Sequence, residues 1–280
     1  MKLAYRLVNV FTQNGERLTG NPLCVFEDGR ALETEQMQAL ALQFNLSETT
    51  FVLPSDKADA RVRIFTPTFE MAFAGHPTLG TAHVVRSLKN LGREVALEMK
   101  AGVIPVVADG DRWELRANTA TSRKPSATRT QLATAFGLNE HSIVGQPLWI
   151  NSGTEQLVVP LASADAVNSL KISVDLLTAA TQDGPRAQAY LFAERGSDTV
   201  LSRFFFNKGG SMTEDPATGS AAANLGAWYL ANDASLPLNK IISQGEMIGR
   251  PSTLRLRVDA NRNVFVAGEV IEVGRGYVEL

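Results

Sequence analysis

Cysteine, histidine and long apolar runs are scarce in this sequence. Its 280 residues include one cysteine, Cys24, and three histidines. A single cysteine excludes an internal disulfide framework and a zinc site built from several thiolates. No apolar run approaches the ~18–20 residues that span a bilayer, and the first residues lack the continuous apolar stretch of a secretory signal. We therefore expect a cytoplasmic protein that neither binds nor crosses a membrane.

The chain also lacks an excess of charge of either sign. It has 27 Lys+Arg against 29 Asp+Glu, a net charge of −2 and a pI near 6.0. Such a surface offers no electrostatic attraction for nucleic acid. No Walker A loop, complete dinucleotide fingerprint or nucleophile elbow occurs either. The hydrophobic share of 44% and the charged share of 20% are ordinary for a folded globular chain.

Most of the periodicity that is present predicts strands. Alternation of apolar and polar residues over 60–65, 113–116 and 253–258 is typical of strands with one buried face. Helical spacing is rarer. It predicts an amphipathic helix over about 33–44, and another over about 129–136 that ends at Gly137.

Two further segments predict helices without a polar face. Residues 77–85 and 216–228 are small or apolar almost all round, so we expect each helix to be buried on all sides. Each segment begins with a proline, Pro77 or Pro216, which is favoured at the first helical position because its missing N–H costs nothing there.

The same two segments match one another, which indicates an internal repeat. Residues 75–82 align with 214–221 at a shift of 139, and Phe65 meets Phe204 at the same shift. The polar stretch 118–126 then serves as a linker. We expect an α+β fold of two pseudo-symmetric halves, each a curved, barrel-like sheet around one apolar helix. The halves would be 1–118, joined by a final strand near 275–280, and 127–274.

The repeat suggests where chemistry occurs. A helix N-terminus carries unpaired N–H groups and the positive end of the dipole, which suit a carboxylate. If both buried helices point into a cleft between the halves, His76 and Asp215 would face each other across it. A small acidic ligand is the partner that such a cleft would hold.

Several motifs resemble those of the PhzF phenazine-biosynthesis family, in the right order along nearly the whole chain. They are Gly20-Asn21-Pro22, Asn45-Leu46-Ser47-Glu48-Thr49-Thr50-Phe51, Phe73-Ala74-Gly75-His76-Pro77, Glu214-Asp215-Pro216-Ala217-Thr218-Gly219-Ser220, Gln244-Gly245 and Gly249-Arg250-Pro251. The resemblance implies a diaminopimelate epimerase-like fold, a homodimer, and activity without cofactor or metal. The racemising members of that fold use two cysteines, which a chain with one thiol cannot supply.

The resemblance also implies an isomerase that moves a proton between carbons of a small carboxylated metabolite. Glu48 would be the general acid/base, because a partly desolvated carboxylate performs such a transfer well. His76 and Asp215 would act with it as catalytic residues and hold a polar substituent of the substrate. The remaining substrate-binding residues would be Asn21, Ser47, Gly75, Gly219 and Ser220, with the last two at the substrate carboxylate.

Other interpretations remain open at the level of sequence. Taken alone, Glu48 resembles a solvated surface residue, and Asp215 suits a helix N-cap. His83 lies too far along the helix from His76 to share a metal, so we expect it to be packed, and we expect Cys24 to be a core residue. The alternatives to an isomerase are a non-catalytic acid-binding protein and a lyase or cyclase that uses the same base. The physiological substrate is not predicted.

Overall fold

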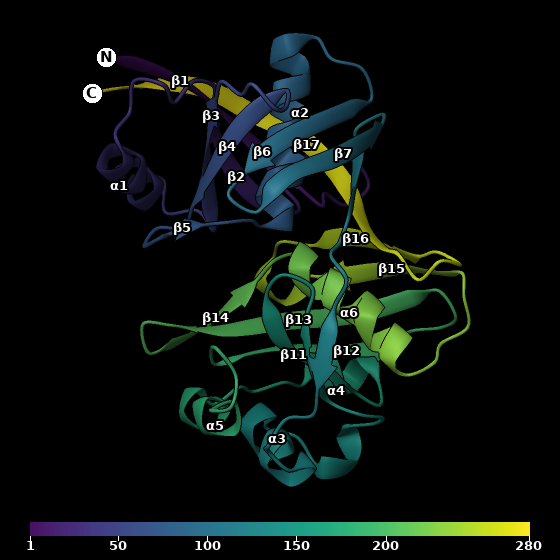
Figure 1. Ribbon diagram of the computed structural model, residues 1–280. Coiled ribbons are helices and arrows are strands. Elements are labelled where there is room, and N and C mark those ends of the chain that lie inside the picture. The colour runs from purple at the N-terminus through teal and green to yellow at the C-terminus, as the bar shows by residue number, and fades with distance from the viewer. The chain divides into compact units, whose positions relative to one another are not determined.

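The computed structural model describes residues Met1–Leu280 and contains two compact units. The first comprises Met1–Arg116 and Ala267–Leu280, and the second comprises Ala117–Val266 (Figure 1). None of the helices has both the length and the apolar composition needed to cross a membrane.

The first unit is a closed β-barrel. Its elements are β1 (Lys2–Val10), β2 (Asn21–Phe26), α1 (Thr34–Phe44), β3 (Glu48–Leu53), β4 (Ala60–Phe65), β5 (Glu70–Met71), α2 (Gly75–Lys89), β6 (Glu94–Met99), β7 (Gly102–Asp109), β8 (Arg112–Arg116) and most of β17 (Val264–Glu279). The strands pair in the order β1, β2, β3, β4, β6, β7, β8 and β17, and β17 pairs back onto β1. The chain ends lie side by side where β1 and β17 begin and end (Figure 1).

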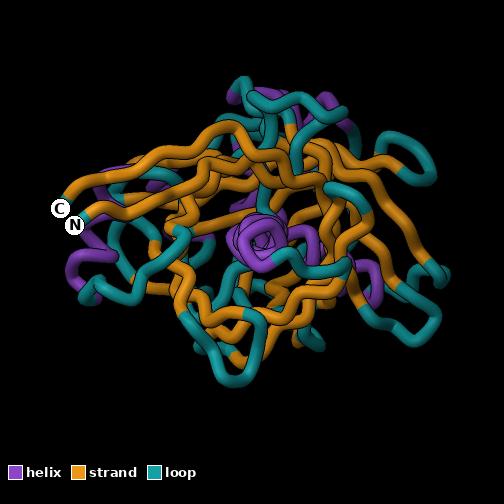
Figure 2. Tube along the Cα trace, turned by 90° about the horizontal axis from the view of Figure 1, so that it is seen from above, coloured by secondary structure: helices purple, strands orange, loops and turns teal.

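Helix α2 fills the inside of this barrel. Ten of its 15 residues are buried, and it contacts β1, β2, β3, β4, β6 and β8. Viewed end-on in Figure 2, the helix is surrounded by strands. Small residues such as Gly80 and Ala82 allow this close approach, because a helix buried on all sides has no room for long side chains. The predicted mixture of helices with a barrel-like sheet is confirmed.

The second unit contains a curved sheet and more helices. Its elements are β9 (Thr121–Arg123), α3 (Arg129–Phe136), the 3-10 helix η1 (Glu140–Ser142), β10 (Leu148–Asn151), β11 (Glu155–Pro160), α4 (Ala164–Asn168), α5 (Val174–Ala180), β12 (Gln188–Glu194), β13 (Thr199–Lys208), β14 (Ser211–Asp215), α6 (Gly219–Ala231), β15 (Leu238–Gln244), the 3-10 helix η2 (Glu246–Ile248) and β16 (Ser252–Val258). Helix α6 packs on β10, β11 and β16 with nine of its 13 residues buried.

Both units pair their strands in the same order and direction. In the first, β1–β2 is antiparallel, β2–β3 parallel, β3–β4 and β4–β5 antiparallel, β4–β6 parallel and β6–β7 antiparallel. In the second, β10–β11, β11–β12, β12–β13, β13–β14, β13–β15 and β15–β16 repeat this series. The polypeptide therefore builds the same strand arrangement twice.

The register corrects the predicted shift of 139. Phe65 lies opposite Glu70 in the first unit and Phe205, not Phe204, lies opposite Glu214 in the second, so the matching strands β4 and β13 are 140 positions apart. Between these paired residues, the β13–β14 hairpin contains more residues than the β4–β5 hairpin. The following helices therefore begin 144 positions apart, at Gly75 and Gly219. The proline matched at 139 is therefore not a structural match.

Helix boundaries confirm some predictions and correct others. The predicted helix over 33–44 is α1, and α3 covers 129–136, with Gly137 in the left-handed conformation after it. Pro77 and Pro216 are not first helical residues, because α2 begins at Gly75 and α6 at Gly219. Pro77 is tolerated because the first N–H groups of a helix have no partner within it.

The predicted linker 118–126 is more ordered than expected. Thr121–Arg123 form β9, which pairs with β10. Arg123 also forms ion pairs with Glu155 and Asp183, 2.9 and 3.1 Å long. Local composition did not indicate these contacts, because the partners lie 32 and 60 residues further along the chain.

Candidate active site

Glu48 and His76 form a hydrogen-bonded pair inside the first unit. Glu48 is the first residue of β3, and His76 is the second residue of α2. The Oε2 atom of Glu48 lies 2.9 Å from Nδ1 of His76. The side chains are 17% and 6% exposed, so water reaches the carboxylate more easily than the imidazole. Glu48 is therefore not a freely solvated surface residue.

The pair leaves one imidazole nitrogen available. When Glu48 is ionised, its carboxylate can only accept hydrogen bonds, and Nδ1 of His76 then carries the hydrogen that points to it. The other nitrogen, Nε2, is buried and has no hydrogen-bond partner in the protein. Since buried polar atoms are nearly always paired, an unpaired one calls for an explanation. One explanation is that Nε2 binds an atom of the substrate, and the position of His76 at a helix N-terminus supports it.

The other predicted residues of the first unit differ in their surroundings. Gly75 is buried at the first position of α2, and Asn21 is buried at the start of β2. Residue Leu23 of β2 lies opposite Glu48 in the parallel pair β2–β3. Ser47 is exposed and makes no side-chain hydrogen bond, so the structure gives it no role beyond preceding Glu48.

In the second unit, Asp215 is the last residue of β14 and not an N-cap. Thr218 is the N-cap residue of α6, and its hydroxyl donates a 2.5 Å hydrogen bond to Asp215. Gln244, fully buried, donates to the carbonyl of Asp215 at 2.9 Å and to the Thr218 hydroxyl at 3.0 Å. These bonds hold the segment 215–218 as a turn, and the helix begins only after it at Gly219.

Ser220 is the second residue of α6 and is half-buried. With the shift of 144, it occupies the position in α6 that His76 has in α2. The Nε2 of Gln156, on β11, donates a 3.0 Å hydrogen bond to its hydroxyl oxygen. The sequence prediction missed Gln156 and gave Gln244 no role. A glutamine within a mostly apolar strand, as at Gln156, is a sequence signal that could have identified it.

Comparison with known proteins places this arrangement in a family. The family model described as phenazine biosynthesis-like protein, PhzC-PhzF, matches residues 8–276. The chain belongs to this family. It is 39% identical over 98% of its length to an uncharacterized isomerase from Pasteurella multocida, of which the match covers 93%. It is also 34% identical to trans-2,3-dihydro-3-hydroxyanthranilate isomerase from Pseudomonas aeruginosa, with 98% and 97% of the two chains covered. The resemblance inferred from the sequence motifs is confirmed.

A solved structure supports the fold of this PhzF-family chain. The PhzF-family protein of Bacillus anthracis superposes with a TM-score of 0.88 over 100% of both chains, at 24% identity. At that identity the likeness shows the shared fold. Together with the isomerase names of the sequence relatives, the family assignment identifies the chain as an isomerase.

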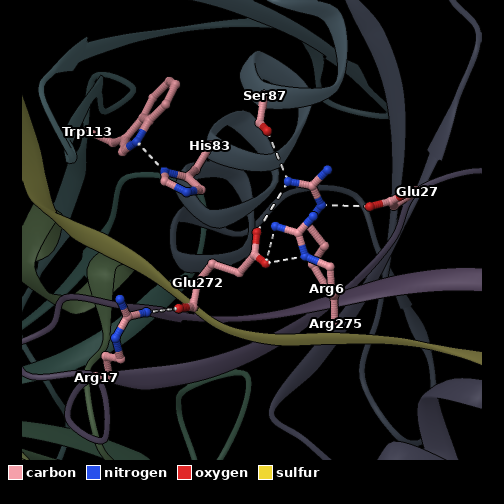
Figure 3. A network of polar contacts seen from close by, with 8 residues as sticks. All are labelled: Arg6, Arg17, Glu27, His83, Ser87, Trp113, Glu272 and Arg275. Carbon is pink, nitrogen blue, oxygen red and sulfur yellow. Dashed lines mark hydrogen bonds and ion pairs between the residues drawn. The ribbon is translucent and has the colours of Figure 1, made fainter.

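A second polar network in the PhzF-family fold lies further along α2 (Figure 3). Arg6, 7% exposed, donates to Glu27 at 2.6 Å, to Ser87 at 3.0 Å and to Glu272 at 3.2 Å. Arg17 and Arg275 both contact Glu272. Arg6 is paired with two carboxylates, which is what burial of an arginine requires, whereas Arg17 donates to the backbone carbonyl of Glu272.

The packed roles expected for His83 and Cys24 agree with the structure. The indole N–H of Trp113 donates to Nδ1 of His83 at 3.3 Å (Figure 3). Burial lowers the pKa of His83 below its ordinary value. Cys24 is fully buried, and burial raises the pKa of its thiol. No cluster of three or more His, Cys, Asp or Glu side chains is arranged to hold a metal ion.

Proposed function

We propose that this isomerase moves a proton between two carbons of a small carboxylated substrate, with Glu48 as the general acid and base. The observation that carries the proposal is the 2.9 Å hydrogen bond from His76 to Glu48. It uses one carboxylate oxygen, Oε2, and leaves Oε1 to take a proton from carbon. Only a group already fixed in direction can remove a proton and return it at a second position with the same geometry.

The proton and electrons balance without a further reactant. Glu48 takes the proton as the first C–H bond breaks, and the electron pair moves through the conjugated system of the substrate. The same carboxyl group, which solvent reaches, exchanges its proton with water and then delivers a proton to the second carbon. His76 orients Glu48 through Nδ1 and offers Nε2, which has no protein partner, to a polar substituent of the substrate.

In the second unit, we assign Asp215, Gly219 and Ser220 to substrate binding. The first-turn N–H groups of α6 and the Ser220 hydroxyl suit a carboxylate. The proposed substrate class is supported by the relative named trans-2,3-dihydro-3-hydroxyanthranilate isomerase, whose name denotes a carboxylated ring with amino and hydroxyl groups. The expected homodimer and cytoplasmic location belong to the same proposal, and light scattering of the purified chain tests the first.

Solvent exchange tests the proposal. The enzyme is incubated with trans-2,3-dihydro-3-hydroxyanthranilate in D₂O, and the product is analysed by NMR and mass spectrometry. We expect an isomeric product with deuterium on carbon, formed by the unaltered chain and by His83→Gln. Glu48→Gln should lose about 10²–10⁴-fold in rate, as removal of a general base does.

Other outcomes exclude the proposal in distinct ways. A bound but unchanged ligand without deuterium indicates the non-catalytic binding protein. A product that has lost water or closed a new ring indicates the lyase or cyclase. Full turnover and exchange in Glu48→Gln would show that another residue carries the proton.

A further inference from the structure

A chain of buried amides runs from the sheet of the second unit to Ser220. Gln156, Asn224 and Ser152 are 2%, 0% and 8% exposed. Asn224 lies on α6 and donates through Nδ2 to Oε1 of Gln156 at 2.8 Å. Gln156 in turn donates through Nε2 to the hydroxyl oxygen of Ser220 at 3.0 Å. Four side chains are thus linked end to end within one unit.

The direction of every bond in this chain is set at its inner end. The backbone N–H of Ser152 donates to Asn224 at 3.0 Å, and a backbone N–H cannot act as an acceptor. The Asn224 amide must therefore present Oδ1 there, which also accepts from the Ser152 hydroxyl at 2.6 Å. Its Nδ2 is thereby directed at the carbonyl of Thr154, 2.9 Å away, and at Gln156.

The direction set at Asn224 also determines the direction of the hydrogen bond between Gln156 and Ser220. Gln156 accepts from Asn224 with its oxygen, so its NH₂ group faces Ser220 and donates. The Ser220 oxygen is then an acceptor in that bond, and its own proton must point elsewhere. No acceptor in the protein takes that proton. A half-buried hydroxyl that is held as a donor suits an anionic oxygen, because hydrogen bonds to charged groups are the stronger ones.

The corresponding positions of the first unit are apolar. When the strands of the two units are aligned by their register, Gln156 of β11 takes the place of Leu23 of β2. When α2 and α6 are aligned from their first residues, Asn224 takes the place of Gly80. The backbone framework therefore does not require polar groups at these positions, because the first unit fills them with a leucine and a glycine. The free-energy cost of burying two amides must be offset by their hydrogen bonds. The two amides therefore add specificity without a clear gain in stability.

We propose that Gln156 and Asn224 are positioning residues that fix the Ser220 hydroxyl as a donor to the substrate carboxylate. This inference rests on the substrate-binding role assigned to Ser220 above. It concerns affinity for the carboxylate, and it leaves the proton transfer by Glu48 unchanged. The relay therefore affects Kd and KM for carboxylated ligands and has little effect on kcat.

A matched pair of ligands isolates this contribution. The probes are 3-hydroxyanthranilate and 2-aminophenol, which differ only in the carboxylate, with binding measured by calorimetry on the full chain. We expect Gln156→Leu to weaken binding of 3-hydroxyanthranilate about tenfold, the cost of one charged hydrogen bond, and to leave 2-aminophenol unchanged. The control is Gln188→Leu, because Gln188 is 4% exposed but donates to the carbonyl of Glu155 and not to Ser220.

A second variant reverses the relay without shortening it. Asn224→Asp can still accept from Ser152 but cannot donate, so the Gln156 amide must turn its NH₂ group inward. Its oxygen would then accept the Ser220 proton. We expect a loss of carboxylate affinity of at least tenfold, and circular dichroism and thermal unfolding confirm that each variant is folded.

Double variants distinguish a relay from a general disturbance. In a Ser220→Ala background, Gln156→Leu and Asn224→Asp should cause no further loss of 3-hydroxyanthranilate affinity. Equal losses with and without Ser220, or equal losses for both ligands, would overturn the relay. If Ser220→Ala weakens carboxylate binding and Gln156→Leu does not, the relay alone is wrong. If Ser220→Ala itself has no effect, the substrate-binding role proposed for Ser220 is wrong, and deuterium exchange still tests Glu48 independently.

Discussion

Gly80 of α2 lies so close to Leu23 of β2 that no side chain fits between them. A Cβ atom on Gly80 would lie 2.5 Å from Cδ2 of Leu23 and 2.9 Å from Cγ2 of Val10. The φ angle of Gly80 is not in the left-handed region, so the restriction is steric and not conformational. This contact fixes how closely the helix approaches the barrel strands.

Gly80→Ala should therefore destabilise the protein, against the usual trend for helices. Alanine is favoured over glycine within a helix by about 1 kcal/mol, but overpacking a core typically costs about 1–3 kcal/mol. We expect a net loss of up to about 2 kcal/mol in the free energy of unfolding, measured with urea. Gly92→Ala, where a Cβ meets nothing within 4 Å, is the matched control and should be neutral. A more stable Gly80→Ala variant would contradict the packing described here.

His76 should affect the rate through Glu48. Removing the imidazole in His76→Ala frees the carboxylate to rotate, and misplacement of a reacting group by about 1 Å can cost ~10²-fold. We expect kcat to fall about 10²-fold while thermal stability changes little. His83→Gln, on the same helix but bonded to Trp113, should retain activity. Equal activity of the two variants would show that His76 does not orient Glu48.

The ion pair between Arg203 and Glu214 should be important for stability. Two hydrogen bonds of 3.0 and 2.7 Å join them, and the side chains are only 11% and 7% exposed. Removing one partner of a buried pair leaves the other charge uncompensated and costs about 3–5 kcal/mol. We expect a loss in that range for Glu214→Gln in urea unfolding. Asp28→Asn, in the exposed pair with Arg30, should show no resolvable change.

Stability should fall in mild acid because of His83. Burial lowers the pKa of this imidazole, so the unfolded chain binds a proton at a higher pH than the folded one does. The stability that neutral His83 contributes is complete above about pH 6.5, the ordinary value, and is lost as the pH falls through the lower folded value. We expect Tm to drop less between pH 7.5 and pH 5.5 in His83→Gln than in the unaltered chain. Parallel Tm curves would show that His83 does not contribute.

Local patterns predicted the elements whose structure depends on nearby residues. The periodicity over 33–44 and 129–136 corresponds to α1 and α3, and Gly137 ends α3 as expected. Helix boundaries were wrong where a distant residue decided them. Gln244, 26 residues after Thr218, holds the turn before α6 and delays the helix to Gly219. A motif match cannot show that displacement, because it depends on contact between β15 and the turn.

The site was also only partly accessible from sequence. Glu48 and His76 were identified by their motifs, and the structure adds that they bond to one another across 28 positions. Ser47 and Asn21 were named from the same family resemblance, yet one is exposed and the other buried. The amides of Gln156 and Asn224 belonged to no motif, and only the packing of α6 on β11 brings them together.

By itself the sequence determined the family, the alternation that makes strands, and two helices too apolar to face water. Those properties follow from residue type and spacing, which act over a few positions. Tertiary structure alone decided the true offsets of the repeat, the pairing of Glu48 with His76 and the donor direction at Ser220. Each of these depends on the three-dimensional register of strands against helices, since a hydrogen bond forms only where donor and acceptor approach within about 3 Å in the right direction.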